Sequence, residues 1–210
     1  MGGGVSLPRR RISRRNQGKT MRILMLGNSF TAANDLPQRL AQLTGAEVMA
    51  HTRGGARLAE QLNPQTKLGA RTLAALEGEP WDFVVLQEMS HGPISSPQSF
   101  FTSVERLCEW IHAKGATPVL FATWAYEKGG AKLAAKGWDY EDMARRLAQN
   151  YRQAAVENHA LLAEVGQRFY DLSPTHPLYA ADGVHPNEDG TQLAAEVLAE
   201  TILTHKEFTP

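Results

Sequence analysis

Five short apolar runs along the chain alternate with segments in which apolar residues recur at helical spacing. The runs cover residues 22–28, 47–52, 81–87, 117–124 and, more weakly, 161–165. Helical spacing is found near residues 36–43, 65–77, 97–115, 139–158 and 187–203. Continuous apolar runs of this length are typical of strands that are covered on both faces. Their alternation with helices predicts an α/β fold: a doubly wound, mostly parallel sheet of about five strands in a three-layer α/β/α sandwich.

Basic residues are concentrated at the start of the chain. The 210 residues have a formal net charge of +0, but residues 1–20 hold six basic residues and no acidic one. The remaining 16 basic residues against 22 acidic ones leave the body with a charge of −6. We predict that residues 1–20 form a basic, disordered leader and that residues 21–210 form a single domain. A leader that binds nucleic acid is the alternative.

Composition argues against several kinds of protein. Residues 1–20 lack the apolar segment of a secretory signal peptide, and no run approaches the ~18 apolar residues of a membrane span. We therefore expect a cytoplasmic protein that does not span a membrane. Cys108 is the single cysteine, so neither an intramolecular disulfide nor a thiolate metal cluster can form. No GxGxxG or P-loop pattern occurs, and we expect no cofactor, no metal and no nucleic-acid partner.

Residues whose side chains can take part in catalysis follow the apolar runs. In doubly wound folds, ligands bind beyond the carboxyl ends of the strands. The first run ends on Gly27-Asn28-Ser29, which places a serine at the edge of the predicted sheet. The segment before the last helix contains Asp182 and His185, three residues apart and followed by a proline. A carboxylate that orients an imidazole beside a hydroxyl is the arrangement that nucleophilic catalysis needs. The alternative is that Ser29 and Asp182 only form turns and helix caps.

Attack on an acyl carbon also requires donors for the oxyanion that develops. The candidates are the backbone N–H of Ser29, an N–H of Gly54 or Gly55, and the side-chain amide of Gln87. Glycine suits this role because the backbone must approach the substrate closely. All of these residues follow predicted strands, so the sequence predicts that nucleophile, base and donors meet at one edge of the sheet.

Four further residues near these strand ends are assigned to substrate binding. They are Asn28, Glu88, Trp124 and Tyr126. An aromatic side chain beyond the fourth run would suit the face of a sugar. The alternative for Trp124 and Tyr126 is packing beneath a lid formed by the loop 127–138.

These motifs resemble those of the SGNH, or GDSL-type, hydrolase superfamily of serine esterases and lipases. Its first block, a strand leading into G-D-S, is similar to GNSFT here, with Ser29 as nucleophile. Its lone glycine corresponds to Gly54 or Gly55, and its final D-x-x-H corresponds to Asp182 and His185. The resemblance extends from residue 21 to about residue 204. The third block, normally G-x-N-D, is LQEMS here, so the chain looks like a variant with Gln87 in place of the asparagine.

The resemblance implies a flavodoxin-like fold and a serine esterase that hydrolyses small acyl esters through an acyl-enzyme. The use of Gln and Glu in the third block resembles carbohydrate-acetyl esterases, so acetyl esters of sugars are the expected substrates. The expected partner is therefore a small-molecule ester, with the oligomeric state left open. An acyltransferase or thioesterase on the same fold, or a non-catalytic ligand-binding protein, are the alternatives.

Overall fold

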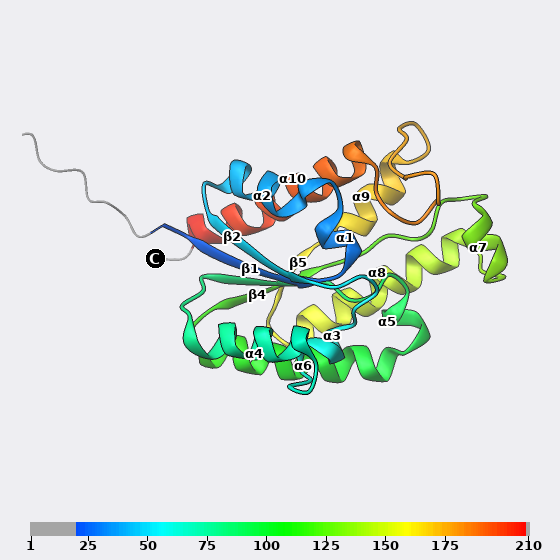
Figure 1. Cartoon of the computed structure of the whole chain (residues 1–210). Helices are drawn as coiled ribbons and strands as arrows, with labels where there is room; N and C mark the ends of the chain where they lie inside the picture. The colour runs from blue at the N-terminus through cyan, green and yellow to red at the C-terminus, as the bar shows by residue number, and fades with distance from the viewer. Residues whose placement is uncertain (1–19, 209–210) are drawn as a thin grey trace, which may run out of the picture.

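A five-stranded sheet forms the centre of the structure, a computed structural model that describes residues 20–208 (Figure 1). The strands are β1 (Arg22–Gly27), β2 (Glu47–Thr52), β3 (Phe83–Leu86), β4 (Thr117–Phe121) and β5 (Leu161–Ala163). Their order is β2-β1-β3-β4-β5, and every pair is parallel. The predicted doubly wound α/β fold is therefore confirmed. The predicted leader falls on residues 1–20, of which 1–19 lie outside the described part of the chain.

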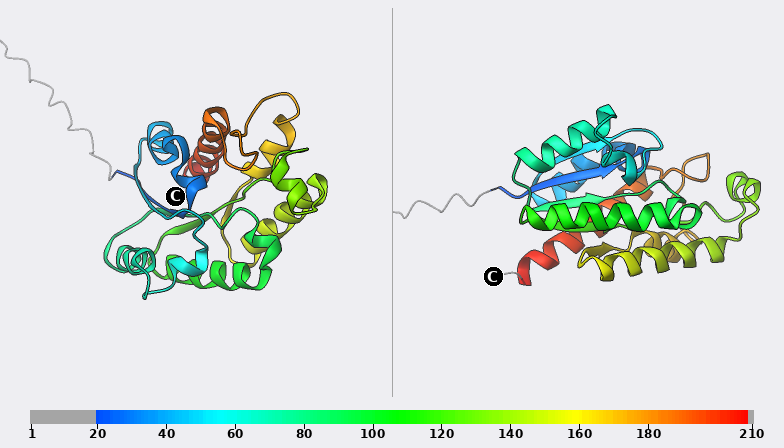
Figure 2. Two further views of the ribbon diagram at one scale, coloured as in Figure 1. Left: turned by 45° about the vertical axis from the view of Figure 1, so that its right-hand side comes forward. Right: turned by 90° about the horizontal axis from the view of Figure 1, so that it is seen from below.

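Long helices cover the sheet in two layers (Figures 1 and 2). One layer contains α2 (Leu36–Thr44), α9 (Val165–Leu172) and α10 (Glu188–Phe208), and the other contains α4 (Lys67–Gly78), α6 (Pro97–Ala113) and α8 (Tyr140–Glu157). Short helices follow β1 to β4 along the chain: α1 (Ser29–Ala32) with the 3₁₀ turn η1 (Ala33–Asp35), α3 (Leu58–Gln61), α5 (Gly92–Ser95) and α7 (Ala131–Ala135). These short helices hold the connections at the end of the sheet where the predicted site lies.

The two central strands are buried on both faces. Residues 23–26 of β1 and 84–86 of β3 are all 0% exposed. Because each large apolar side chain contributes about 1.5–3 kcal/mol when fully buried, these strands anchor the core. In the parallel register Leu26 lies beside Leu86, and Leu86 lies beside Leu120. The three strands thus end at one level, which brings the segments beginning at Asn28, Gln87 and Ala122 together.

The sequence pattern misplaced some boundaries. Strand β4 ends at Phe121, although the apolar run continues to Trp124, because the backbone beyond the strand turns to pair with the start of α9: the Gly166 N–H donates to the Ala122 carbonyl (2.9 Å). Helix α9 itself was not predicted, since its buried apolar side chains are only Val165 and Phe169. The loop 127–138 contains the five-residue helix α7.

Stability should depend on pH through His51 of β2. This side chain is 3% exposed, and its Nδ1 lies 3.2 Å from the Thr72 hydroxyl. Burial, reinforced by the charge of Arg71, lowers the pKa of His51 from 6.5 to about 4. The unfolded chain binds a proton here as the pH falls below about 6.5, whereas the folded chain does not until about pH 4. Because of His51, acidification from about pH 7 to pH 5 should therefore lower the free energy of unfolding by about 2 kcal/mol, which corresponds to a fall in Tm of about 4–8 °C.

Thermal unfolding of wild type and His51→Gln at the two pH values measures this contribution. The variant should lose less stability on acidification than the wild type. The matched control is His176→Gln, because His176 is exposed; this variant should keep the wild-type pH dependence. An equal loss in wild type and His51→Gln would contradict the assignment.

Candidate functional site

Ser29 lies at a sharp turn from strand to helix. Asn28 is the N-cap of α1, and its Oδ1 accepts a hydrogen bond from the Phe30 N–H (3.0 Å). A Cβ at Gly27 would collide with the Thr31 side chain and lie 2.6 Å from Gln87 Oε1, so only glycine fits at the last position of β1. Ser29 is the first helical residue, and N–H groups at this position have no partner within the helix. The turn therefore presents a hydroxyl and an N–H together.

The hydroxyl of Ser29 meets His185, as the sequence motif predicts. Ser29 Oγ lies 2.9 Å from His185 Nε2, and His185 Nδ1 lies 2.6 Å from Asp182 Oδ2. The other carboxylate oxygen of Asp182 accepts the backbone N–H groups of Val184 (3.0 Å) and His185 (2.9 Å). Burial raises the pKa of Asp182, but the hydrogen bonds from His185 and Val184 outweigh it and lower the pKa to about 2. Asp182 is therefore a carboxylate at neutral pH, able to hold the imidazole with Nε2 toward the serine.

Trp124 packs behind His185 through Phe30 and through the backbone of Val184. Its indole stacks between Phe30 (4.6 Å between ring centroids) and Phe169 (4.0 Å), and its Nε1–H donates to the Val184 carbonyl (3.0 Å). The Phe30 ring in turn meets the imidazole of His185 edge-on at 5.4 Å. Trp124 is only 1% exposed. It packs beneath the site, in contrast to the substrate contact that the sequence suggested, because the chain turns inward after β4.

Asn34 ties the nucleophile segment to the histidine segment. Its backbone adopts a left-handed conformation (φ 45°), which asparagine tolerates better than most residues. Its Nδ2 donates to the carbonyl of Pro186 (3.1 Å) and to the hydroxyl of Thr191 (2.9 Å). The turn after α1 is thereby fixed to the residue that follows His185. The sequence analysis missed this residue, because an asparagine after a short helix carries no distinctive pattern.

Gly54 and Gly55 form an exposed turn after β2. The Ala56 N–H donates to the Arg53 carbonyl (2.9 Å), and Gly55 has a φ of 68°. No atom lies within 4 Å of a Cβ placed at either glycine, so the space beside the turn is open. Asn28 Nδ2 holds this turn by donating to the Ala56 carbonyl (3.0 Å). The turn is thus fixed relative to Ser29 by the residue that precedes the serine.

The buried side chains of Gln87 and Glu88 connect the segments that follow the strands through hydrogen bonds. Gln87 is 1% exposed; its Oε1 accepts from the Asn28 N–H (3.0 Å) and the Thr31 hydroxyl (2.9 Å), and its Nε2 donates to the Glu88 carbonyl. Glu88 is 3% exposed, and its two carboxylate oxygens accept from Leu58 N–H (3.1 Å) and Met89 N–H (2.7 Å). The Gln87 amide is therefore engaged with backbone and Thr31, which differs from the predicted oxyanion role. The side chain of Gln87, longer than that of asparagine, bends back to bond the protein itself.

Of the four residues assigned to substrate binding, Tyr126 lines a pocket beside the histidine. Asn28 is 2% exposed and, like Glu88 and Trp124, bonds to the protein itself. Tyr126 is 6% exposed and its hydroxyl lies 3.0 Å from Ser90 Oγ. The pocket has a volume of about 490 Å³ and is lined by Tyr126, Lys132, Ala135, Lys136, Asp182, Val184 and His185. The two lysines, on the loop 127–138, were not singled out from the sequence, because surface lysines are common.

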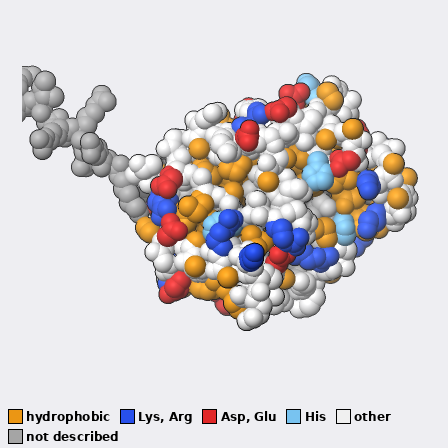
Figure 3. All heavy atoms as spheres, in the orientation of Figure 1, with side chains coloured by type: hydrophobic (Ala, Val, Ile, Leu, Met, Phe, Trp, Pro, Cys, Tyr) orange, Lys and Arg blue, Asp and Glu red, His pale blue; other side chains and the backbone are white. Residues whose placement is uncertain are grey.

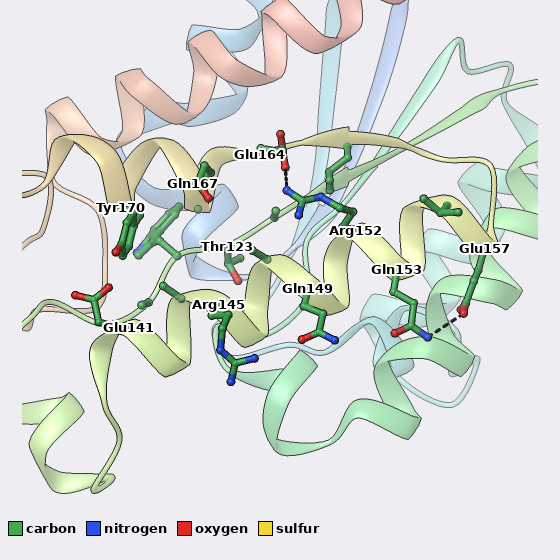
Figure 4. Close-up of a pocket in the computed structure, with 18 residues that line it drawn as sticks. Thr123, Glu141, Arg145, Gln149, Arg152, Gln153, Glu157, Glu164, Gln167 and Tyr170 are labelled. Atoms are coloured by element: carbon green, nitrogen blue, oxygen red, sulfur yellow. Dashed lines mark hydrogen bonds and ion pairs between the residues drawn. The ribbon is translucent and has the colours of Figure 1, made fainter.

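A larger cavity of about 790 Å³ lies between α8 and α9 (Figure 4). Its rim carries an ion pair between Arg152 and Glu164 (2.6 Å) and a hydrogen bond from Gln153 to Glu157 (2.9 Å). The described residues that line it include no serine, cysteine or histidine. This cavity therefore lacks a serine–histidine pair like the one that Ser29 after β1 and His185 before α10 form.

Two further features are absent from residues 20–208. No group of three or more His, Cys, Asp or Glu side chains in this part of the chain is placed to hold a metal ion. Among the same residues, every helix is too short or too polar to cross a bilayer.

Comparisons with known proteins find one matching family and several similar structures. The model of the GDSL-like Lipase/Acylhydrolase family matches residues 25–193. A candidate SGNH hydrolase from Slackia heliotrinireducens is 55% identical, with a TM-score of 0.85 over 88% of this chain and 100% of that chain. A DUF4886 family protein from Bacteroides uniformis is 19% identical, with a TM-score of 0.69 over 89% and 84% of the two chains. A mutant of Axe2, an acetyl-xylooligosaccharide esterase from Geobacillus Stearmophilus, is 14% identical, with a TM-score of 0.63 over 87% and 94%. No curated protein matches the chain.

Proposed function

Because the chain belongs to the GDSL-like lipase/acylhydrolase family and is an ester-bond hydrolase, we propose that Ser29, His185 and Asp182 form its catalytic triad. The observation that carries this proposal is the continuous hydrogen-bonded chain from Ser29 Oγ through the imidazole to the Asp182 carboxylate, at 2.9 and 2.6 Å. Nucleophile, base and orienting group are thus in contact before any substrate binds.

In the proposed reaction His185 removes the proton from Ser29 as the hydroxyl oxygen attacks the ester carbonyl. The imidazolium that forms is stabilised by Asp182, and it then protonates the departing alcohol. Water attacks the acyl-enzyme in the second half of the reaction, with His185 as base. The carboxylic acid leaves and the serine hydroxyl is restored.

The oxyanion is proposed to bind backbone N–H groups. The Ser29 N–H, at the start of α1, and an N–H of the Gly54-Gly55 turn are the candidates. Gln87 contributes by fixing the Asn28 backbone, one residue before the nucleophile. Removing one such donor costs about 10²–10³ in kcat in other serine hydrolases, so the position of this turn matters for rate.

The proposed substrates are small acyl esters, with acetyl esters of carbohydrates as the first group to examine. Tyr126 supports this assignment, because it provides an aromatic wall in the pocket beside His185. The carbohydrate ester named for Axe2 belongs to a protein that shares the fold with this chain at 14% identity, and it supplies a starting panel of substrates.

Covalent trapping tests the proposed mechanism. A dialkyl p-nitrophenyl phosphate should phosphorylate one serine and inactivate the enzyme, and peptide mass spectrometry should locate the adduct on Ser29. His185→Gln should react at least about 10²-fold more slowly, because the base is missing. A Ser90→Ala variant, which removes another hydroxyl near the strand ends, should be labelled like the wild type. An adduct on another residue, or equal labelling of Ser29→Ala, would sink the proposal.

A further inference from the structure

The pocket beside His185 is bordered by two lysines without acidic partners. Lys132 and Lys136 are both exposed and both line this pocket together with His185 and Asp182. Neither forms an ion pair with a carboxylate among residues 20–205, the side chains that the structure describes. By contrast, the neighbouring Lys128 lies 2.9 Å from Glu141. The two ammonium groups are therefore available to a ligand in the pocket that His185 and Asp182 also line.

A third cation lies near the same group of residues. Arg57, at the start of α3, likewise has no ion pair within the described residues. Both Arg57 and Lys136 lie close enough to His91 to affect it. Burial lowers the pKa of this histidine, and the charges of Lys136 and Arg57 lower the pKa further. Figure 3 shows basic side chains near the histidines on the right-hand part of this face, where the strands end.

Negative charge around the pocket does not cancel the two lysines. Arg57 does face a carboxylate: burial raises the pKa of Glu88, and the backbone N–H groups it accepts together with the charge of Arg57 oppose that rise. Asp182 is the acidic side chain in the pocket lining, and it is hydrogen-bonded to His185. Glu88 is 3% exposed and saturated by backbone N–H groups. Glu127 lies against Gly183, on the segment that carries the histidine, and does not line the pocket. When His185 takes the proton of Ser29 in the proposed reaction, the imidazolium offsets the charge of the Asp182 carboxylate, and the oxyanion carries the new negative charge.

Aromatic rings hold one of the lysines in place. Lys136 Nζ lies 5.4 Å from the centre of the Trp138 ring, within range of a cation–π contact. The Trp138 ring also packs against His91 (5.4 Å) and Tyr126 (6.4 Å). This aromatic cluster restrains the flap that carries the lysines, residues 127–138, and offers an apolar surface beside them.

We propose that this pocket selects esters that carry an anionic group, a carboxylate or a phosphate, near the scissile ester bond, and that Lys132 and Lys136 bind this group. The inference rests on the proposed function, since it assigns a substrate class to the same site. The flap lysines are specificity-determining residues and take no part in proton transfer.

Paired probes with and without an anionic group test the proposal. On the acyl side, 4-nitrophenyl hemisuccinate is compared with 4-nitrophenyl butyrate; on the alcohol side, 4-acetoxybenzoate and 4-acetoxyphenyl phosphate are compared with phenyl acetate. The wild type should have a kcat/KM at least about tenfold higher for a charged probe than for its neutral match, after correction for their intrinsic reactivities. Salt at about 0.5 M should reduce this preference and leave the neutral probes unaffected. The better probe also identifies which anion and which side of the ester the pocket accepts.

The double variant Lys132→Met, Lys136→Met should lose the preference, so that kcat/KM for each charged probe comes within about threefold of kcat/KM for its neutral match in the same variant. Lys136→Arg should retain most of it, and Lys128→Met is the control for a flap lysine that is already paired. Equal rates for charged and neutral probes, or a preference that survives in the double variant, would overturn the inference. The proposed function stands if Ser29→Ala abolishes turnover of the neutral probes. If no probe is turned over, calorimetric binding of monomethyl succinate against methyl butyrate to wild type and double variant still decides the question.

Discussion

Replacement of Ser29 by alanine should lower kcat for p-nitrophenyl acetate by about 10⁴-fold or more. Alanine removes the oxygen that forms the acyl-enzyme in the proposed mechanism; this atom, Ser29 Oγ, lies 2.9 Å from His185 Nε2. The residual rate would come from substrate binding and the oxyanion donors alone. Because Ser29 is half-buried and its hydroxyl bonds only to the imidazole, the Tm should change by no more than about 3 °C.

The matched control is Ser90→Ala. Ser90 also follows a central strand, but its hydroxyl contacts the hydroxyl of Tyr126 at 3.0 Å instead of a histidine. Loss of one hydrogen bond of this kind should change kcat by less than about tenfold. Steady-state rates and circular-dichroism melting curves of both variants make the comparison. If Ser29→Ala kept more than a tenth of the wild-type kcat, the nucleophile would have to lie elsewhere.

His185 and Asp182 should differ in how much activity their loss removes. His185→Gln deletes the base and should lower kcat by about 10⁴-fold or more. Asp182→Asn should cost about 10³–10⁴-fold. The asparagine oxygen can keep the N–H bonds of Val184 and His185, but its NH₂ group would donate to His185 Nδ1, where Asp182 Oδ2 now accepts. The imidazole would then carry its proton on Nε2, facing the serine, in the tautomer that cannot act as base.

Single-turnover kinetics with p-nitrophenyl acetate distinguish these effects. Both variants should be slow in forming the acyl-enzyme, which separates loss of chemistry from loss of substrate binding. His176→Gln is the control, because this exposed imidazole bonds only to the neighbouring Thr175 hydroxyl (2.9 Å). A His185→Gln enzyme with near wild-type acylation would rule out the proposed base.

The positions of the strands and the motif residues could be predicted because both depend on local pattern. Strands β1 and β3 are buried on both faces and appear in the sequence as uninterrupted apolar runs. Parallel strands end at a common edge, so residues that follow them must lie near one another. This rule brought Ser29, Gln87 and the Gly54-Gly55 turn to one region without knowledge of the fold.

The direction of individual side chains could not be predicted in the same way. Gln87 and Trp124 follow strands as expected, but one folds back to bond Asn28 and Thr31, and the other turns inward to stack between Phe30 and Phe169. Such choices depend on three-dimensional neighbours that lie far away in the sequence. Lys132 and Lys136 were not predicted to lie near the site at all. The flap that carries them has no strong sequence pattern, and their place beside His185 follows only from the fold.

The contact between Ser29 and His185 joins residues that are 156 positions apart in the chain. During synthesis the segment that supplies the nucleophile leaves the ribosome long before the segment that supplies the base. Asn34 completes the link only when Pro186 and Thr191 have also emerged. A nascent or truncated chain that stops before residue 185 therefore holds a serine with ordinary reactivity. Recovery of activity during refolding should in turn report the docking of the segment that carries His185, which is made after the segment that carries Ser29.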